Sequence, residues 1–414
     1  MMKWGEIKDP IHGYIELSEA ERGVLDTWPL QRLRRIRQLA MAHLTYPGAE
    51  HSRFQHSLGA MHLSGLFGER LRDLGLIDGD DVELLRLAGL LHDVGHGPFS
   101  HLFEELLRRR GLSHEDLGRR IIVETVVADV LGDYGFKPSE VSELSVGRLP
   151  GRGFLNQVVA GQFSADTLDY LVRDSYYTGV EYGRIDVRRL IDSVDVLDDV
   201  LSMDMAALYA LEAFLIARYE MFKAVYFHRT VRAASVMLIR AMELADEALG
   251  LTDFKSLDDY LNLDDERVLS MLLTLEGDGE LETARRMAEM LRGRRLLKCA
   301  YERFLGEEEL QGLKLRVGEL EETLAEGAGA DGRFLIVDVS TAPSVPYNPG
   351  RSRPEEIRLF IREADGSRRC LNFSDVSPLA SVLLGYINIL RVYCRAEDLN
   401  AVRGEARRLF ESEG

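Results

Sequence analysis

Leu91-His-Asp-Val-Gly-His-Gly-Pro-Phe-Ser-His101 is the segment that decides how this sequence is interpreted, because it places three histidines and an aspartate directly after an apolar run. The adjacent His92 and Asp93 can offer an imidazole nitrogen and a carboxylate oxygen to one divalent metal, and zinc, iron, manganese and nickel accept both. Pro98 is expected to end the helix and free His101 to point elsewhere. A single His-Asp pair is weak evidence, and the alternative is a polar helix terminus capped by histidines.

A second histidine-rich segment, His51-Ser-Arg-Phe-Gln-His56, precedes the first. His56 is a candidate for a further metal ligand. Arg53 lies three residues earlier, so the two can share a helical face, and its guanidinium can offer a forked donor to phosphate. The alternative is an arginine and a histidine on a solvated face.

A third segment, Asp166-Thr-Leu-Asp-Tyr-Leu-Val-Arg-Asp174, carries charged residues and a tyrosine at helical spacing. Steps of three, four, seven and eight residues place these side chains along one stripe of a helix. For Asp169 and Arg173 we favour an intrahelical salt bridge. Asp166, at the start of the stripe, is a candidate for a fourth metal ligand.

The fourth segment, Arg218-Tyr-Glu-Met-Phe-Lys-Ala-Val-Tyr-Phe-His-Arg229, combines cations with aromatic residues. The guanidiniums of Arg218 and Arg229 and the phenol of Tyr226 fall on one predicted helix face and could grip a phosphate chain. The equally weighted alternative is a pair of arginines whose stems cover core aromatics.

Composition excludes several classes of protein. The chain of 414 residues is 46% hydrophobic and 29% charged, as in globular proteins, with a net charge of −18 that disfavours nucleic acid and anionic lipid. Nine of its ten histidines precede residue 115, which indicates a site. Its three cysteines form no CxxC pair, and neither a signal peptide nor an apolar run of membrane-spanning length occurs. We therefore expect a cytoplasmic protein without membrane contact.

Apolar periodicity predicts a mainly α fold. Residues 18–325 show helical spacing, with long helices expected over 205–248 and 280–304, and they form the predicted domain 1–325. The segment EGAGADG at 326–332 marks a change in composition. After it, strands are predicted at 334–340, 357–363 and 388–395, with helices at 377–385 and 396–412. These elements form the predicted small α+β domain, 330–414.

Together the segments resemble the HD-domain phosphohydrolases, and more narrowly the deoxynucleoside triphosphate triphosphohydrolases. The resemblance also includes Lys8-Asp-Pro-Ile-His-Gly13 and Gln31-Arg-Leu-Arg-Arg-Ile-Arg-Gln-Leu39, and it follows the order of the family's motifs over nearly the whole chain. It implies a large all-helical HD-domain core, one divalent transition metal (Mn, Fe, Zn or Ni) and Mg²⁺ with the substrate phosphates.

The resemblance assigns roles to residues. The implied metal ligands are His56, His92, Asp93 and Asp166. The implied catalytic residues on the α-phosphate side are His96, His101, Glu104 and His114, where Glu104 replaces the family's usual aspartate. The implied substrate-binding residues are Gln38, Leu39, Arg53, Tyr170, Asp174, Arg218 and Tyr226.

The implied activity is metal-dependent hydrolysis of dNTPs, dGTP among them, to a deoxynucleoside and inorganic triphosphate. An activating nucleotide is implied at Asp26, Gln31 and Arg34, although a surface salt bridge explains these residues equally well, and assembly as a homo-dimer or homo-tetramer is implied too. One alternative is an HD-type hydrolase of a mono-, cyclic or alarmone nucleotide. Another is a non-catalytic nucleotide-sensing scaffold.

Overall fold

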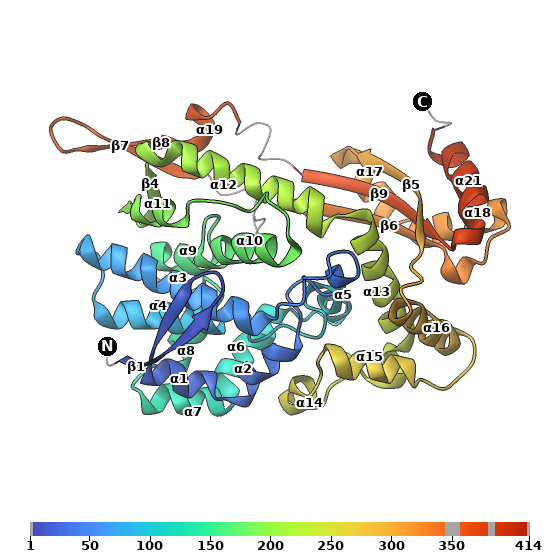
Figure 1. The fold of residues 1–414 in the computed structure, drawn as a ribbon, viewed down its shortest axis with the longest axis horizontal. Coiled ribbons are helices and arrows are strands. Elements are labelled where there is room, and N and C mark those ends of the chain that lie inside the picture. Colours follow the sequence, from blue (N-terminus) through green and yellow to red (C-terminus); the bar gives the residue numbers. More distant parts are fainter. Residues whose placement is uncertain (1–2, 344–356, 380–385, 412–414) are drawn as a thin grey trace.

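The computed structural model describes residues 3–343, 357–379 and 386–411, and these are mainly helical (Figure 1). The helices are α1 (Glu19–Leu25), α2 (Trp28–Arg32), α3 (Arg53–Asp73), α4 (Gly79–Leu91), α5 (His101–Arg109), α6 (His114–Glu124), α7 (Val126–Asp133), α8 (Pro138–Ser145), α9 (Gly153–Ala160), α10 (Ala165–Thr178), α11 (Val187–Asp192), α12 (Leu208–Met221), α13 (Arg229–Leu249), α14 (Leu257–Leu261), α15 (Asp265–Leu273), α16 (Glu280–Arg292), α17 (Glu307–Lys314), α18 (Val317–Ala328), α19 (Phe373–Val376) and α21 (Leu399–Glu411). The strands are β1 (Lys3–Asp9), β2 (Gly13–Ser18), β3 (Val194–Leu197), β4 (Val200–Asp204), β5 (Lys298–Leu305), β6 (Ile336–Pro343), β7 (Arg358–Arg362), β8 (Arg368–Asn372) and β9 (Tyr386–Cys394). The expected mainly α fold is confirmed.

Helices α3 and α4 pack against each other and lie between α9 and α10 on one side and α8 on the other (Figure 1). Apolar residues of α3 contribute to two cores: Leu58 belongs to the core under α1 and α13, and Phe67 to the core under α9 and α12. Residues on more than one face of α3 are therefore buried. His56 lies in the buried first turn of α3, and His92 directly follows the buried last turn of α4.

Helix α10 packs against α3, and local sequence sets where it starts and stops. The Ser164 side chain caps it by accepting a hydrogen bond from the backbone N–H of Thr167 at 3.2 Å. Gly179, with φ of 76°, ends it in the left-handed conformation. This start places Asp166 in the first turn, facing α3.

The strands form three small sheets. Strands β1 and β2 make an antiparallel hairpin, β3-β4-β7-β8 form a mixed sheet, and β9 lies between β5 and β6. Strand β5 precedes the predicted boundary at 325–330, yet it shares a sheet with β6 and β9, which follow it. The boundary itself stays a prediction.

Two local expectations are wrong, and a third falls mostly outside the described residues. The helix expected over 280–304 ends at Arg292, because Gly293 and the left-handed Arg294 (φ 51°) turn the chain into β5. The helix expected over 205–248 is divided by a π-helical turn, Phe222–Tyr226, followed by a break at Phe227. Of the helix expected over 377–385, residues 377–379 are not helical and 380–385 lie outside the described residues.

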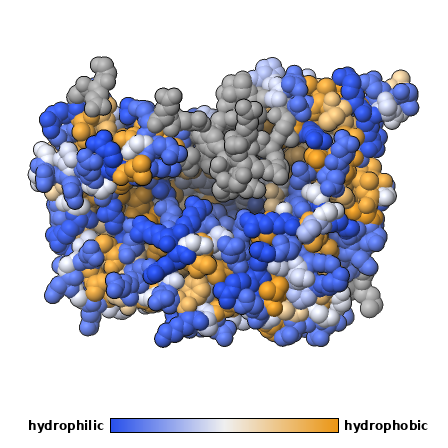
Figure 2. Space-filling model, turned by 180° about the vertical axis from the view of Figure 1, so that it is seen from behind, coloured by the Kyte–Doolittle hydropathy of each residue, from blue (hydrophilic) through white to orange (hydrophobic). Residues whose placement is uncertain are grey.

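The face of the molecule in Figure 2 is dominated by hydrophilic side chains, with apolar ones scattered between them. Among the residues that the structure describes, no helix has both the length and the apolarity needed to cross a membrane.

Candidate metal and nucleotide site

Three candidate metal ligands converge where α3, α4 and the following loop meet. The ligand atoms of His56, His92 and Asp93 all lie within 4.8 Å of one another. The Nε2 atoms of the two histidines are 3.2 Å apart, and Asp93 Oδ1 lies 3.3 Å from His92 Nε2. Asp166 Oδ1 approaches from α10, 3.0 Å from His56 Nε2 and 3.7 Å from His92 Nε2. The structure thus brings all four predicted ligands together.

Both imidazoles are oriented by their other nitrogen. His56 Nδ1 lies 2.8 Å from Asp169 Oδ2, and His92 Nδ1 lies 2.8 Å from the Gly89 carbonyl. Each contact is to an acceptor, so Nδ1 carries the hydrogen and Nε2 keeps its lone pair for a metal. Two nitrogens and two carboxylates around one point form a donor set that fits a divalent transition metal.

The charge around this cluster also fits a cation. Burial alone would lower the pKa of His56, but its hydrogen bonds to Asp166 and Asp169 raise that pKa to about 10. The ring therefore holds a proton at neutral pH unless another cation replaces it. Burial acts on Asp93 in the opposite direction, yet the Arg53 guanidinium, 2.5 Å from Asp93 Oδ2, holds the pKa of this carboxyl well below its usual range.

The candidate catalytic side chains gather beside Asp93. The rings of His96 and His114 stack with centroids 4.0 Å apart, and His101 meets the ring of His96 edge-on at 4.9 Å. Glu104 accepts from His114 Nδ1 at 2.8 Å and lies 3.4 Å from His101 Nδ1. The side chain of His101 is 69% exposed, whereas that of His96 is 2% exposed. His101 is thus the most accessible member of the group to an incoming molecule.

The loop before His101 has a strained backbone, which hydrogen bonds to residues outside the loop hold in place. Phe99 and Ser100 both have φ of 56°, a conformation that side-chain-bearing residues rarely adopt. The buried carboxylate of Asp265 accepts from the Phe99 N–H at 2.6 Å and from the Arg37 N–H at 3.0 Å. Ser100 Oγ donates to the Arg37 carbonyl and accepts from Arg53 Nε. These bonds fix the direction in which His101 leaves the loop.

A buried guanidinium with two unpaired nitrogens among the described residues marks the candidate phosphate site. Arg218 on α12 is 2% exposed, and its Nε and Nη1 find no hydrogen-bond partner among the described residues. The rings of Tyr170 and Tyr226 lie nearby, 6.3 Å apart. Burying a charged donor without a partner is costly, so such a group indicates a missing anion. Arg229 lies instead at the start of α13 and lines a cavity of about 340 Å³ that includes neither Arg218 nor Tyr226.

Asp174, a candidate substrate-binding residue, links this region to two others, Gln38 and Leu39. Its carboxylate accepts from the Tyr226 hydroxyl at 2.8 Å and lies 2.7 Å from His51 Nε2. The backbone N–H of Gln38 donates to the carbonyl of His51 at 3.0 Å, and the side-chain Oε1 of Gln38 has no partner among the described residues. Leu39 packs at the edge of the same apolar core as Tyr170 and Tyr226.

Residues 53–133 match the family model of the HD domain, and residues 185–413 match that of the HD associated region. The chain belongs to the HD-domain phosphohydrolase family. A Bacillus subtilis protein, uncharacterized, is 34% identical over 86% of this chain and 83% of its own length. A Dictyostelium discoideum homolog of deoxynucleoside triphosphate triphosphohydrolase SAMHD1 is 33% identical over 70% of this chain. A phosphohydrolase of solved structure from Bacteroides thetaiotaomicron is 28% identical, with a TM-score of 0.75 over 95% of this chain and 100% of that one.

The chain aligns with only part of the length of some relatives. The chain spans 59% of the Dictyostelium protein and about half, 53%, of an uncharacterized Methanocaldococcus jannaschii protein. The latter is 37% identical over 61% of this chain.

The residues predicted for an activating nucleotide are only partly brought together in the HD-domain phosphohydrolase. Arg34 Nε donates to Gln31 Oε1 at 2.9 Å, and the guanidinium of Arg34 lies over the Phe54 ring. Asp26 is exposed and pairs with Arg22 at 3.5 Å. Asp26 and Arg34 therefore do not pair with each other in this structure, and the activating-nucleotide site stays a prediction.

The sequence analysis did not predict the roles of two residues that hold the site in place, Asp169 and Asp265. Asp169 and Arg173 do form the expected intrahelical pair, but Asp169 also contacts His56 and His12. The role of Asp265 was missed entirely, since its contacts are to backbone groups far away in sequence. For Asp169 a signal existed: it lies three residues after the predicted ligand Asp166.

Proposed function

We propose that this chain is a metal-dependent deoxynucleoside triphosphate triphosphohydrolase, with dGTP among its substrates. The observation that carries the proposal is the combination of the His–His–Asp cluster with the buried Arg218, two of whose nitrogens have no hydrogen-bond partner among the described residues. The cluster suits one metal, and the two unpaired guanidinium nitrogens can donate to an anion. The similarity to SAMHD1 relatives supports a deoxynucleoside triphosphate as that anion.

In this proposal His56, His92, Asp93 and Asp166 hold one divalent transition metal, which is Mn, Fe, Zn or Ni. When bound, such a metal supplies Lewis acidity and lowers the pKa of a coordinated water. A Mg²⁺ ion accompanies the substrate phosphates, because this ion favours phosphate oxygens and water.

The remaining residues bind the substrate. Arg218 and Tyr226 contact the triphosphate, joined by Arg53, which also fixes Asp93. Gln38 and Leu39 pack against the deoxyribose, where close contact would exclude a 2′-hydroxyl. Tyr170 and Asp174 lie near the 3′-hydroxyl.

The reaction joins the oxygen of water to the α-phosphorus and breaks the bond between that phosphorus and the 5′-oxygen. Arginine donors spread the charge of the transition state. His101 donates the proton to the departing 5′-oxygen, since it is the exposed member of its group, and His96, Glu104 and His114 orient it. The products are a deoxynucleoside and inorganic triphosphate.

Product analysis tests the proposal. Purified protein with Mn²⁺ and Mg²⁺ is incubated with each dNTP and NTP, alone and in pairs, and the phosphate product is identified by ion chromatography. Triphosphate release supports the proposal. Release of orthophosphate or pyrophosphate points to another HD-type hydrolase, and absence of turnover with every nucleotide points to a sensing scaffold. Pairs of nucleotides, with the mass of the particle in solution, test activation and assembly as a dimer or tetramer.

A further inference from the structure

Asp169 is the most heavily hydrogen-bonded carboxylate near the metal cluster, and its partners come from three separate segments. It is fully buried on α10. Its Oδ2 accepts from His56 Nδ1 and from Arg173 Nε, both at 2.8 Å. Its Oδ1 lies 2.6 Å from His12 Nε2 and accepts from Arg173 Nη2 at 3.0 Å. One carboxylate therefore connects a candidate metal ligand to the N-terminal hairpin.

The turn of that hairpin is built around a second carboxylate, Asp9. Asp9 Oδ1 accepts from the backbone N–H groups of Ile11 and His12, both at 2.9 Å, which folds the three-residue turn. Gly13, with φ of 79°, completes the reversal into β2. Asp9 Oδ2 also accepts from Arg173 Nη1 at 2.9 Å. The same aspartate thus shapes the turn and fastens it to α10, where His12 meets Asp169.

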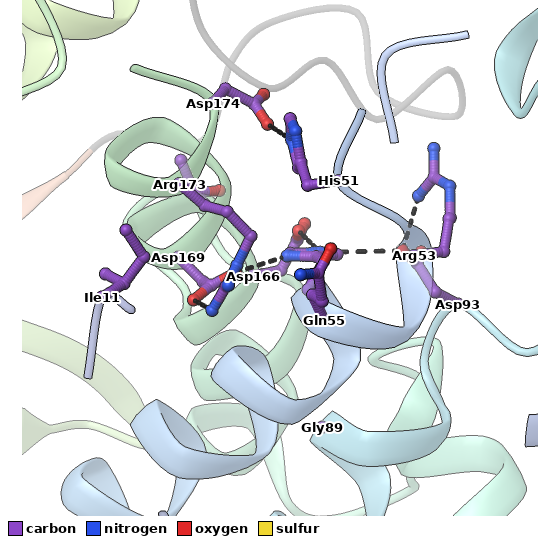
Figure 3. A network of polar contacts seen from close by, with 12 residues as sticks. Ile11, His51, Arg53, Gln55, Gly89, Asp93, Asp166, Asp169, Arg173 and Asp174 are labelled. Atoms are coloured by element: carbon purple, nitrogen blue, oxygen red, sulfur yellow. Dashed lines mark hydrogen bonds and ion pairs between the residues drawn. The ribbon is translucent and has the colours of Figure 1, made fainter. Parts of the chain in front are cut away.

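Helix α3 leaves no room for this arrangement to shift. A methyl group added at Gly59 would lie 1.8 Å from Asp169 Oδ1 and 2.5 Å from Arg173 Nη2. Gly59 lies one turn after His56, so the backbone of α3 itself forms a wall of the carboxylate's pocket. Figure 3 shows Asp169 and Arg173 reaching toward α3, with Ile11 of the turn beside them.

We propose that Asp169 is a positioning residue for His56 and that the hairpin turn, residues 9–13, takes part in this positioning through His12. The inference rests on the proposed metal centre and deepens it. A carboxylate that holds the distal nitrogen of a metal-binding histidine fixes the orientation of the ring and raises its basicity, and its loss lowers metal affinity 10- to 100-fold. Here the carboxylate is in turn oriented by a hairpin that contributes no ligand.

Metal affinity, measured without substrate, tests the inference. Wild-type protein and variants are titrated with Mn²⁺ alone, with free Mn²⁺ followed by its EPR signal. We expect Asp169→Asn to weaken Mn²⁺ binding by about 10- to 100-fold and His12→Leu by about 10-fold. His12→Gln keeps a side-chain N–H toward Asp169 and is expected to retain most of the affinity.

Asp338→Asn provides the matched control. Asp338 on β6 is also a buried aspartate in a two-bond pair with an arginine, Arg232, at 2.8 Å for each bond. The Asp338→Asn substitution should leave Mn²⁺ affinity within about twofold of wild type, since Asp338 contacts no candidate ligand. If Asp169→Asn does not fold, the two His12 variants carry the test.

Three results would overturn the inference. The first is His12→Leu binding Mn²⁺ as tightly as wild type. The second is a loss in Asp338→Asn equal to that in His12→Leu, which would indicate general loosening. The third is a wild-type protein that binds no Mn²⁺, which would overturn the proposed metal centre as well; the first two leave that centre standing.

Discussion

The Nε2 atoms of His56 and His92 face each other at 3.2 Å, while the Nδ1 atom of each ring is bonded to another acceptor. Two nitrogen lone pairs at this distance repel unless a proton or a metal lies between them. The pair is therefore a cation site by geometry, and the neighbouring Asp93 and Asp166 add the negative charge that a divalent ion needs.

Removing one ring should abolish both metal binding and turnover. We expect His92→Ala to lower metal occupancy below detection and dGTP hydrolysis by about 100-fold or more, because a ligand position is lost. Metal content by mass spectrometry and triphosphate release measure the two effects. His43→Ala, which removes a ring bonded to the Ala40 carbonyl, should change neither. A His92→Ala protein with full metal content and full turnover would refute the assignment.

Arg218→Gln should weaken substrate binding without weakening the fold. We expect KM for dGTP to rise about 10- to 100-fold, since a charged hydrogen bond to phosphate is lost. The free energy of unfolding should stay unchanged or increase, because Nε and Nη1 are buried and have no hydrogen-bond partner in the part of the chain that the structure describes. Kinetics and urea unfolding measure these quantities.

Arg32→Gln is the control for that variant. Arg32 is equally buried, but it donates to the carbonyls of Leu263 and His96 at 2.9 and 2.8 Å. Its loss should lower the free energy of unfolding by about 2 kcal/mol. If Arg218→Gln destabilises the protein as much as Arg32→Gln does, Arg218 has a structural role.

Asp265 should make stability fall as pH rises through mildly acidic values. Burial raises the pKa of this carboxyl from 3.8 to about 6 in the folded protein. The folded state thus binds the proton more tightly than the unfolded state, so this contribution is complete below pH 4 and is lost as pH rises through 6. The loss amounts to roughly 3 kcal/mol.

Urea unfolding of wild type and Asp265→Asn between pH 4.5 and 7.5 isolates this contribution. The difference in unfolding free energy, wild type minus variant, should decline with pH, because asparagine does not titrate. A difference that rises with pH would show that the folded state favours the ionised carboxylate.

Gly59→Ala should damage the protein, although alanine is the better helix former. The added methyl collides with Asp169 and Arg173, so we expect a loss of about 2 kcal/mol or more in unfolding free energy and weaker Mn²⁺ binding. Gly132→Ala in α7 meets nothing within 4 Å and should be neutral or stabilising by up to about 1 kcal/mol. Thermal unfolding and Mn²⁺ titration compare the two, and equal behaviour would contradict the close approach of α3 and α10.

The sequence was informative wherever chemistry was concentrated in short motifs. His92 and Asp93 are adjacent, and His56 and Asp166 each lie in the first turn of a helix, so four candidate ligands could be named. The structure clusters His56, His92 and Asp93 and places Asp166 next to both histidines. The bonds that orient them could not be predicted. His12 and Asp169 are far apart along the chain, and helical spacing says nothing about contacts between remote segments.

The errors in secondary structure have separate causes. The π-helical turn Phe222–Tyr226 contains neither glycine nor proline, so no residue type in it indicated that the helix expected over 205–248 is interrupted. Residues 298–304, Lys-Cys-Ala-Tyr-Glu-Arg-Phe, mix apolar and charged side chains without a clear period of two, so their pattern did not separate this strand from the helix before it. The N-terminal hairpin, by contrast, had a readable signal, because Ile15 and Leu17 alternate with the exposed Tyr14 and Glu16.

Strand β9 lies between β5 and β6, and in the described parts of the chain neither of these pairs with any strand but β9. It is also the last of the three to emerge from the ribosome. Until β9 has been synthesised, β5 and β6 have unpaired edges, and such edges can pair with strands of other polypeptides. A premature stop codon ahead of β9 should therefore yield aggregated material and not a shortened hydrolase.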